Sequence, residues 1–341
     1  MDSMSAANMN NSPWVTASRV ALARIPTPVE TCKYQWGSHR LLIKRDDLTD
    51  CPMSGNKIRK LEYLVGDALA HDCDTLITCG GVQSNHARAT AIVARRMGLD
   101  CVLVLSGDAP AEFDGNLLLS KLSGADVRIH PDAGSDQRAE RMHRIADELR
   151  DQDRRPYVIT SGGSDEVGVL GYVKGAGEIA DDLSQSAQRV STILAAVGSG
   201  GTYAGLLLGA KLFGIEATIV GATVDSTPDF WRPRLRDYID RSIERWRLDV
   251  RVSDDDIVLI PAAGRGYALS TDAEIEFIAK FAGTTGIYLD PVYTGKTLYA
   301  FDQAVNDGRV KLDGDVLFVH TGGIFGLFPQ RERFNQYINQ T

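Results

Sequence analysis

Short apolar runs rich in β-branched residues alternate along the chain with longer stretches whose apolar residues recur at helical spacing. From Leu41 onward the alternation predicts strands over 41–44, 75–78, 101–105, 127–130, 157–160, 192–197, 218–223, 257–261 and 316–319. It predicts helices over 85–97, 112–122, 136–150, 203–212, 272–281 and 296–306. Strands that alternate with helices form parallel sheets covered by helices on both faces. We therefore predict an α/β fold of this kind.

Composition and charge narrow the class of protein. The chain has 341 residues, of which 43% are hydrophobic, and 37 basic against 45 acidic side chains give a formal net charge of −8. Nucleic-acid binding needs clustered Lys and Arg, which are interleaved with acids here, so no nucleic-acid partner is expected. No apolar run approaches the roughly 18 to 20 residues of a membrane span, so a membrane partner is not expected either.

The N-terminal segment and the cysteines point to a reducing compartment. The start, MDSMSAANMNNSPW, is polar and lacks the charged flank and apolar segment of a secretory signal, so we expect residues 1–17 to be disordered. The five cysteines are odd in number and form no CxxC pair, which argues against a disulfide framework and against a zinc ribbon. We expect a cytoplasmic protein without a metal site.

A glycine-rich turn, Gly198-Ser199-Gly200-Gly201-Thr202, lies between a predicted strand and a predicted helix. Residues without side chains let backbone N–H groups close around an anion, and the helix N-terminus adds partial positive charge. The spacing is not GxGxxG, because Tyr203 stands where the third glycine would fall, so the dinucleotide fingerprint is not met. The turn indicates a phosphate site, with a tight turn that binds nothing as the alternative.

Two polar segments follow predicted strands. Residues 53–62 (MSGNKIRKLE) enter a helix with Arg59 and Lys60 near its start, where cations oppose the helix dipole and favour a local anion or another compensation. In residues 78–87 (TCGGVQSNHA) an N-cap explains one polar side chain but not the whole run. Taken alone, Lys57 is more often a surface residue, and His86 is more often structural than catalytic.

Together these segments resemble the pyridoxal-phosphate enzymes of fold type II, and within them the group of D-cysteine desulfhydrase and 1-aminocyclopropane-1-carboxylate (ACC) deaminase. The resemblance is carried by PTP at 26–28, IKRDD at 43–47, SGNKIRKLE at 54–62, QSNH at 83–86, the glycine-rich turn, DPVYTGK at 290–296 and HTGG at 320–323. It implies two domains, a large one from 18–59 and 176–341 and a small inserted one from 60–175. It also implies a homodimer.

The resemblance implies pyridoxal phosphate as the cofactor. Lys57 would form the Schiff base with it, and Lys60 would help the glycine-rich turn to hold its phosphate. Asn85 resembles the residue that hydrogen-bonds the phenolic oxygen of the cofactor ring, and Tyr293 the one whose ring lies against it. The implied cofactor-binding residues are Lys57, Lys60, Asn85, Gly198, Ser199, Gly200, Gly201, Thr202, Tyr293, Thr294 and Thr321.

The resemblance also implies a small amino acid as the substrate. Ser84 is similar to the active-site serine of the group, and Tyr267 matches a second active-site tyrosine. The implied catalytic residues are Lys57, Ser84, Tyr267 and Tyr293. The implied substrate contacts are Ser84, Asn85, His86 and Tyr267. Either Lys57, or Ser84 with Tyr267, would remove the α-proton.

Three positions resemble the desulfhydrases more than the deaminases. ACC deaminases have a glutamate after the tyrosine, where this chain has Thr294, and a hydroxyl gives a weaker electron sink that suffices when the β-substituent leaves easily. His86 and Thr321 are the other two positions, and either Thr294 or Thr321 should meet the pyridine nitrogen. We expect α,β-elimination, most simply of D-cysteine to pyruvate, sulfide and ammonia. ACC deamination, L-cysteate cleavage and a related C–S lyase with a specialised biosynthetic substrate are the alternatives.

Two other classes fit the sequence less well. Relatives of threonine dehydratase or serine racemase carry Ser-Phe-Lys at the Schiff-base lysine, whereas this chain has Gly55-Asn56-Lys57. A binding protein without a cofactor would have lost the lysine or the glycine-rich turn, and both are present.

Overall fold

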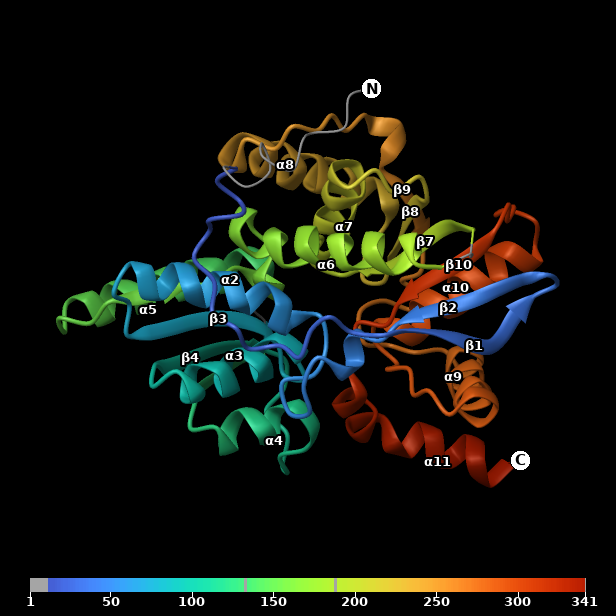
Figure 1. The fold of residues 1–341 in the computed structure, drawn as a ribbon. Coiled ribbons are helices and arrows are strands. Elements are labelled where there is room, and N and C mark those ends of the chain that lie inside the picture. Colours follow the sequence, from blue (N-terminus) through green and yellow to red (C-terminus); the bar gives the residue numbers. More distant parts are fainter. Residues whose placement is uncertain (1–11, 132–133, 187–188, 341) are drawn as a thin grey trace.

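The computed structural model describes residues 12–131, 134–186 and 189–340, and it contains two sheets (Figure 1). The larger sheet has the strand order β1-β2-β10-β7-β8-β9, and the smaller has the order β5-β4-β3-β6. The larger comprises β1 (Val29–Trp36), β2 (His39–Lys44), β7 (Val190–Val197), β8 (Thr218–Thr223), β9 (Val258–Pro261) and β10 (Asp315–Val319). The smaller comprises β3 (Thr75–Gly81), β4 (Asp100–Ser106), β5 (Asp126–His130) and β6 (Pro156–Val158).

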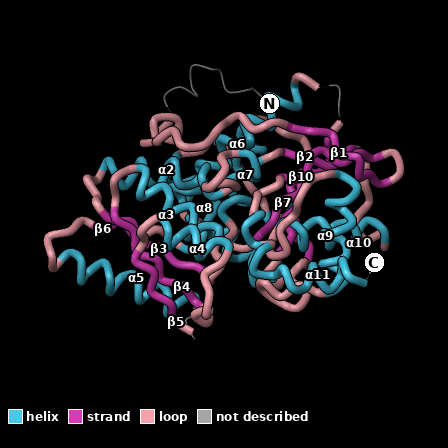
Figure 2. Tube along the Cα trace, turned by 90° about the horizontal axis from the view of Figure 1, so that it is seen from below, coloured by secondary structure: helices cyan, strands magenta, loops and turns pink. Residues whose placement is uncertain are grey.

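Apart from the antiparallel pair β1–β2, the strand pairs are parallel, as predicted. The connecting helices are α2 (Lys57–Ala70), α3 (Asn85–Arg96), α4 (Gly115–Leu122), α5 (Ser135–Arg150), α6 (Glu166–Ser184), α7 (Gly201–Leu212), α8 (Pro228–Trp246), α9 (Asp272–Thr285), α10 (Thr294–Asn306) and α11 (Arg331–Gln340). Figure 2 shows α5 on one side of the smaller sheet, with α3 on the other.

The larger sheet is buried on both faces, and β7 shows this directly. Ile193 belongs to the same apolar cluster as Leu207 of α7, whereas its neighbour Leu194 belongs to the cluster of Phe301 of α10. Because successive side chains of a strand point to opposite faces, α7 and α10 cover opposite faces of the sheet. The predicted fold class, parallel sheets covered by helices on both faces, is confirmed.

The sequence pattern located the predicted strands but missed several elements. Strand β6 spans Pro156–Val158 instead of 157–160, and β1, α6, α8 and α11 were not predicted. Helix α6 contains glycines that oppose a helical prediction, and one of them is required by packing, since a Cβ on Gly171 would lie 2.5 Å from the backbone of Arg59. Helix α8 contains Pro233 and therefore also departs from a helical composition.

The expected domain junctions fall inside helices. Residues 59–60 lie in α2 and residues 175–176 in α6, and these two helices pack against each other. Of the segment expected to be disordered, residues 1–11 lie outside the described residues. Within 12–17, the ring of Trp14 meets that of Phe213 edge to face, with centroids 6.1 Å apart, so the packed chain begins before Ser18. Among the described residues, no helix has the length and apolar character needed to cross a membrane.

Candidate active site

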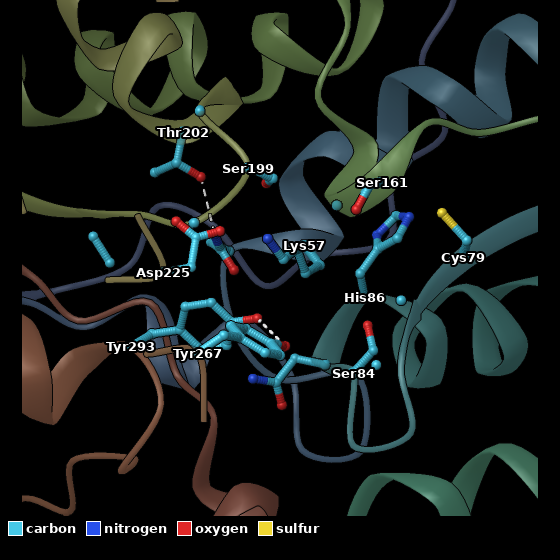
Figure 3. A pocket seen from close by; sticks show the side chains of 18 of the residues that line it. Lys57, Cys79, Ser84, His86, Ser161, Ser199, Thr202, Asp225, Tyr267 and Tyr293 are labelled. Atoms are coloured by element: carbon cyan, nitrogen blue, oxygen red, sulfur yellow. Dashed lines mark hydrogen bonds between the residues drawn. The ribbon is translucent and has the colours of Figure 1, made fainter. Parts of the chain in front are cut away.

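The carboxyl ends of strands from both sheets line one cavity of about 500 Å³ (Figure 3). The larger sheet contributes the turns after β7, β8 and β10, and the smaller contributes the ends of β3 and β4. Parallel sheets bind ligands at these ends, where loops lead into helices. The cavity is therefore in the place that the predicted fold favours.

Lys57 enters the cavity at the start of α2. The preceding Gly55 has φ +106°, and a Cβ there would lie 2.5 Å from the carbonyl oxygen of Thr321, so only glycine fits. That same carbonyl accepts a hydrogen bond from the N–H of Asn56 at 3.1 Å. Lys57 is 9% exposed, and burial lowers the pKa of its ammonium group to about 8. The neutral amine is thus more populated near physiological pH than in an exposed lysine.

The glycine-rich turn faces Lys57 across the cavity. A Cβ on Gly198 would lie 2.8 Å from the ring of Tyr293, so glycine lets that ring reach the turn. The amide of Asn56 donates to Oγ1 of Thr202 at 2.9 Å and ties the turn to the lysine loop (Figure 3). Gly198, Ser199, Gly200 and Thr202 line the cavity, whereas Gly201 does not.

Lys60, which was expected to help the turn hold the phosphate, lies behind this turn and does not line the cavity. Its Nζ donates to the carbonyl of Gly162 at 3.1 Å and to Oγ of Ser164 at 3.0 Å. Ser164 donates onward to Oγ of Ser199 at 2.9 Å and accepts from the N–H of Gly201 at 3.1 Å. Burial lowers the pKa of Lys60 well below its usual value, and the charge of Lys57 adds to the effect. Lys60 acts on the turn through Ser164.

Arg59, the other cation at the start of α2, is compensated by carboxylates. It is 1% exposed and forms two hydrogen bonds of 2.8 Å with Asp46, which also accepts from Thr27 at 2.7 Å and from Tyr172. Glu178 of α6 accepts two more bonds from the Arg59 guanidinium, at 2.9 and 2.8 Å. The positive charge of Arg59 near the helix N-terminus is therefore compensated by the carboxylates of Asp46 and Glu178, without a ligand.

Ser84 and Asn85 begin α3. Ser84 is the N-cap, and its Oγ accepts from the N–H of Ala87 at 3.1 Å. Arg88 fixes the Asn85 amide both directly and through Asn116. Nη1 of Arg88 donates to Oδ1 of Asn85 at 3.4 Å and to Oδ1 of Asn116 at 2.7 Å, so Asn116 must donate from Nδ2 to Oδ1 of Asn85, 3.0 Å away. With its oxygen held in this way, Asn85 offers its NH₂ group to a ligand in the cavity.

His86 lines the cavity beside Lys57 and is 2% exposed. Burial lowers the pKa of its imidazole well below the usual value, and the charges of Lys57 and Lys60 lower it further. Figure 3 shows His86 and Ser84 on the same side of Lys57. His86 is therefore a neutral imidazole at the place expected of a substrate contact.

The two predicted tyrosines also meet in the cavity. Their hydroxyl oxygens lie 2.8 Å apart, and the rings of Tyr267 and Tyr293 are edge to face with centroids 6.0 Å apart (Figure 3). Asp290 positions Tyr293, because its carboxylate accepts from the N–H of Val292 at 2.9 Å and of Tyr293 at 3.0 Å. The buried carboxylate of Asp290, behind the cavity wall, thus holds the backbone of Tyr293, and Tyr293 in turn contacts Tyr267.

Thr294 and Thr321 occupy different environments. Thr294 is fully buried outside the cavity wall, and its hydroxyl donates to Oδ1 of Asp290 and accepts from the Asp290 N–H, both at 2.7 Å. Thr321 lines the cavity in the turn after β10. The structure brings Thr321 to the site and leaves Thr294 as a structural residue at the start of α10.

Several lining residues were not among the predicted site residues. They are Asn56, Cys79, Gly80, Gly81, Ser106, Gly134, Arg138, Ser161, Gly162, Ala196, Asp225, Ser226, Phe230 and Gly322. Ser106 ends β4, and Asp225 follows β8 by two residues, so the rule that ligands bind at strand ends could have found both. Arg138 lies within a charged amphipathic helix whose sequence gives no such signal.

Comparisons with known proteins show the family to which the chain is related. The family model described as pyridoxal-phosphate dependent enzyme matches residues 20–322. A protein of Pyrococcus abyssi, provisionally named as a 1-aminocyclopropane-1-carboxylate deaminase, is 41% identical over 297 residues, covering 87% of this chain and 88% of the relative. The Arabidopsis thaliana protein named bifunctional D-cysteine desulfhydrase/1-aminocyclopropane-1-carboxylate deaminase, mitochondrial, is 37% identical over 330 residues, covering 91% of this chain and 79% of the relative.

A solved structure gives the same answer for the fold. The crystal structure of a protein described as the ACC deaminase homologue superposes with a TM-score of 0.86 at 37% identity, covering 94% of this chain and 96% of that one. The cavity described above thus lies on a backbone shared with that protein.

Proposed function

The chain belongs to the family of pyridoxal-phosphate dependent enzymes, with ACC deaminase and D-cysteine desulfhydrase homologues, and from this premise we propose that it catalyses α,β-elimination on a β-substituted amino acid. D-cysteine, which would give pyruvate, sulfide and ammonia, is the first candidate because of the residues shared with desulfhydrases. ACC deamination is the second candidate, because relatives such as the Pyrococcus abyssi and Arabidopsis thaliana proteins bear that name.

The residues of the cavity fit the cofactor. Lys57 offers an amine of lowered pKa for covalent attachment, and the glycine-rich turn at the start of α7 suits a phosphate. Tyr293 provides a ring that can lie against the cofactor, and the NH₂ group of Asn85 can donate to its phenolic oxygen. Lys60 and Ser164 hold the turn from behind.

Bound pyridoxal phosphate supplies an electron sink that makes the α-proton of the substrate acidic. The lowered pKa of Lys57 suits Nζ to hold that proton, because a base works best when its pKa lies near the operating pH. Ser84 and the first N–H groups of α3 can bind the α-carboxylate, since these N–H groups lack partners within the helix. Tyr267 would orient the substrate from the opposite side through its bond to Tyr293.

The choice of elimination rests on the environment of Tyr293. The carboxylate next to this residue, Asp290, is outside the cavity wall and already accepts hydrogen bonds from Val292, Tyr293 and Thr294. Thr321 instead lines the cavity, and we assign to its hydroxyl the contact with the pyridine nitrogen. A hydroxyl does not keep that nitrogen protonated as a carboxylate would. The weaker electron sink favours a substrate with a good leaving group over an unactivated cyclopropane.

The test is keto-acid release by the holoenzyme from D- and L-cysteine, D- and L-β-chloroalanine, L-cysteate and ACC, with sulfide measured in parallel. We expect pyruvate from β-chloroalanine and pyruvate with sulfide from D-cysteine. The Lys57→Ala variant should release neither, while Lys211→Ala, an exposed lysine on α7, should behave as the wild type. Release of 2-oxobutyrate from ACC, at a rate above pyruvate release from the other compounds, would favour the second candidate.

A further inference from the structure

Arg88, in the first turn of α3, is a buried cation without an acidic partner. Its exposure is 0%, its Nε has no hydrogen-bond partner among the described residues, and no carboxylate of these residues forms an ion pair with it. The positive end of the helix dipole disfavours a cation at this place as well. Burial lowers the pKa of the guanidinium to about 10, so it is still charged at physiological pH.

A comparison with Arg59 shows what this cation lacks. Arg59 is equally buried in the first turn of α2, and it forms an ion pair with Asp46. Helix α4 packs against α3, but Asp114, the acid at the start of α4, forms its ion pair with Arg331. A charge removed from water needs an opposite charge to offset its desolvation. For Arg88 the described residues supply none.

The contacts of Arg88 are all with neutral groups. Nη2 donates to the carbonyl of Ser54 at 2.7 Å, and Nη1 donates to Oδ1 of Asn116 at 2.7 Å and of Asn85 at 3.4 Å. The guanidinium carbon lies 4.8 Å from the centroid of the Phe325 ring. Carbonyl, amide and ring are favourable contacts for a cation, but they carry no net negative charge.

The amide of Asn85 connects Arg88 to the cavity. Asn85 lines the cavity, and its oxygen is held by Arg88 and Asn116. The amide dipole therefore has its negative end at the guanidinium and its positive end, the NH₂ group, available to a ligand. Hydrogen-bonded groups in a low-dielectric interior polarise one another, so the charge of Arg88 strengthens this donor. The NH₂ group of Asn85 is thus a place where an anionic oxygen is stabilised.

We propose that Arg88 is a positioning residue that stabilises the phenolic oxygen of pyridoxal phosphate as an anion, through the amide of Asn85. The inference rests on the proposed function and extends it to a residue outside the cavity wall. In a Schiff base with Lys57, one proton is shared between the nitrogen and the phenolic oxygen. A positive charge behind the oxygen favours the proton on the nitrogen. No atom is gained or lost, and the protonated Schiff base is the form that an amino group attacks more readily.

The test is the visible absorption of the holoenzyme without substrate. The form with the proton on nitrogen absorbs at longer wavelength than the form with the proton on oxygen, so the spectrum gives their ratio. Arg88→Gln removes the charge and keeps an NH₂ donor. We expect it to raise the share of the short-wavelength form, relative to the long-wavelength form, at least about fivefold.

Two further variants separate charge from structure. Arg88→Lys keeps the charge and should restore the ratio to within about twofold of the wild type. Arg95→Gln is the matched control, because Arg95 is an exposed arginine of the same helix, and it should leave the spectrum unchanged. A wild-type ratio in Arg88→Gln would overturn the proposal. A ratio in Arg88→Lys as high as in Arg88→Gln would also overturn it, because the hydrogen-bond geometry and not the charge would then be decisive.

A measurement on the wild type covers the case in which Arg88→Gln does not fold. The cofactor-free protein is titrated with pyridoxal phosphate and with its 3-deoxy analogue, which has the same phosphate and aldehyde but no phenolic oxygen. We expect pyridoxal phosphate to bind at least about tenfold more tightly. Equal affinities would overturn the proposal.

This inference and the proposed elimination fail separately. If the spectra change as expected but no compound of the substrate panel yields a keto acid, the role of Arg88 stands and the elimination is wrong. If pyruvate is released but the spectrum of Arg88→Gln equals that of the wild type, the elimination stands and the role of Arg88 is wrong.

Discussion

Nε2 of His86 lies 3.0 Å from Oγ1 of Thr78, and the same Thr78 hydroxyl donates to the carbonyl of Ile159 at 3.0 Å. A hydroxyl has one proton, so Thr78 must accept from His86, which places the imidazole proton on Nε2. In the neutral ring Nδ1 then carries the lone pair, and this buried atom has no hydrogen-bond partner among the described residues. The tautomer of His86 is thus fixed by a residue outside the cavity.

We predict that His86 makes stability depend on pH. Its folded-state pKa is lowered, so the unfolded chain binds a proton that the folded chain does not. Below the unfolded value of about 6.5, the free energy of unfolding should fall by about 1.4 kcal/mol per pH unit from this group alone. Denaturant unfolding of wild type and His86→Gln at pH 7 and pH 5 measures the difference. His143→Gln, an exposed histidine of α5, should retain the wild-type pH dependence.

Cofactor attachment should follow the ionisation of Lys57. With a pKa of about 8, the rate of attachment to the cofactor-free protein should rise through pH 8 and level off above about pH 9. Visible absorption during reconstitution with pyridoxal phosphate measures this rate. Nα-acetyl-lysine, whose side-chain amine is free, provides the control, because its rate of reaction with pyridoxal phosphate should keep rising through the same range. A protein rate that rises in parallel with the control up to pH 10 would contradict the lowered pKa.

Substitutions of Thr321 and Thr294 should have different effects, the first on cofactor chemistry and the second on stability. Thr321→Val should change the absorption of the bound cofactor and lower kcat on β-chloroalanine, with little effect on unfolding. Thr294→Val should lower the free energy of unfolding by about 1 to 3 kcal/mol, because it leaves the buried N–H of Asp290 without a partner and removes one of the two hydrogen bonds to its Oδ1. The reverse assignment of the two effects would show that Thr294 meets the cofactor.

Arg59 should be a strong determinant of stability. Arg59→Met leaves Asp46 buried and unpaired, and breaking a buried ion pair from one side costs about 3 to 5 kcal/mol. Arg331→Gln, which removes an exposed ion pair with Asp114, should cost less than about 1 kcal/mol. Thermal and denaturant unfolding measure both. Adding Asp46→Leu to Arg59→Met should recover part of the loss, and a further loss would show that the two residues do not act as a pair.

Most of the residues that were expected in the site do line the cavity, because they lie in recognisable sequence motifs at the ends of strands. Lys57, Ser84, Asn85 and the glycine-rich turn all lie at positions where local pattern and strand order agree. Lys60 and Thr294 lie in the same runs but point away from the cavity, and only the packing of Ser164 and Asp290 decides this.

Other features depend on contacts between distant segments. Arg138 reaches the cavity because β4 and β5 place the start of α5 beside Ser106, and nothing in its own helix marks it. Helix α6 was missed for a related reason, since Gly171, one of the glycines that oppose helix formation, lets α2 approach. Its stability comes from tertiary packing, which local propensity does not report.

The position of β10 has a consequence for how the protein is made. This strand comes after β2 and β7 in the chain, yet it pairs with β2 on one side and β7 on the other. While the chain is still emerging from the ribosome, the larger sheet therefore stays in two pieces, and the carbonyl of Thr321 that supports the lysine loop is absent. Until β10 is made, the edges of β2 and β7 that it later covers stay unpaired, and unpaired strand edges favour aggregation. Capture of the cofactor should accordingly follow the synthesis of β10 and of Thr321.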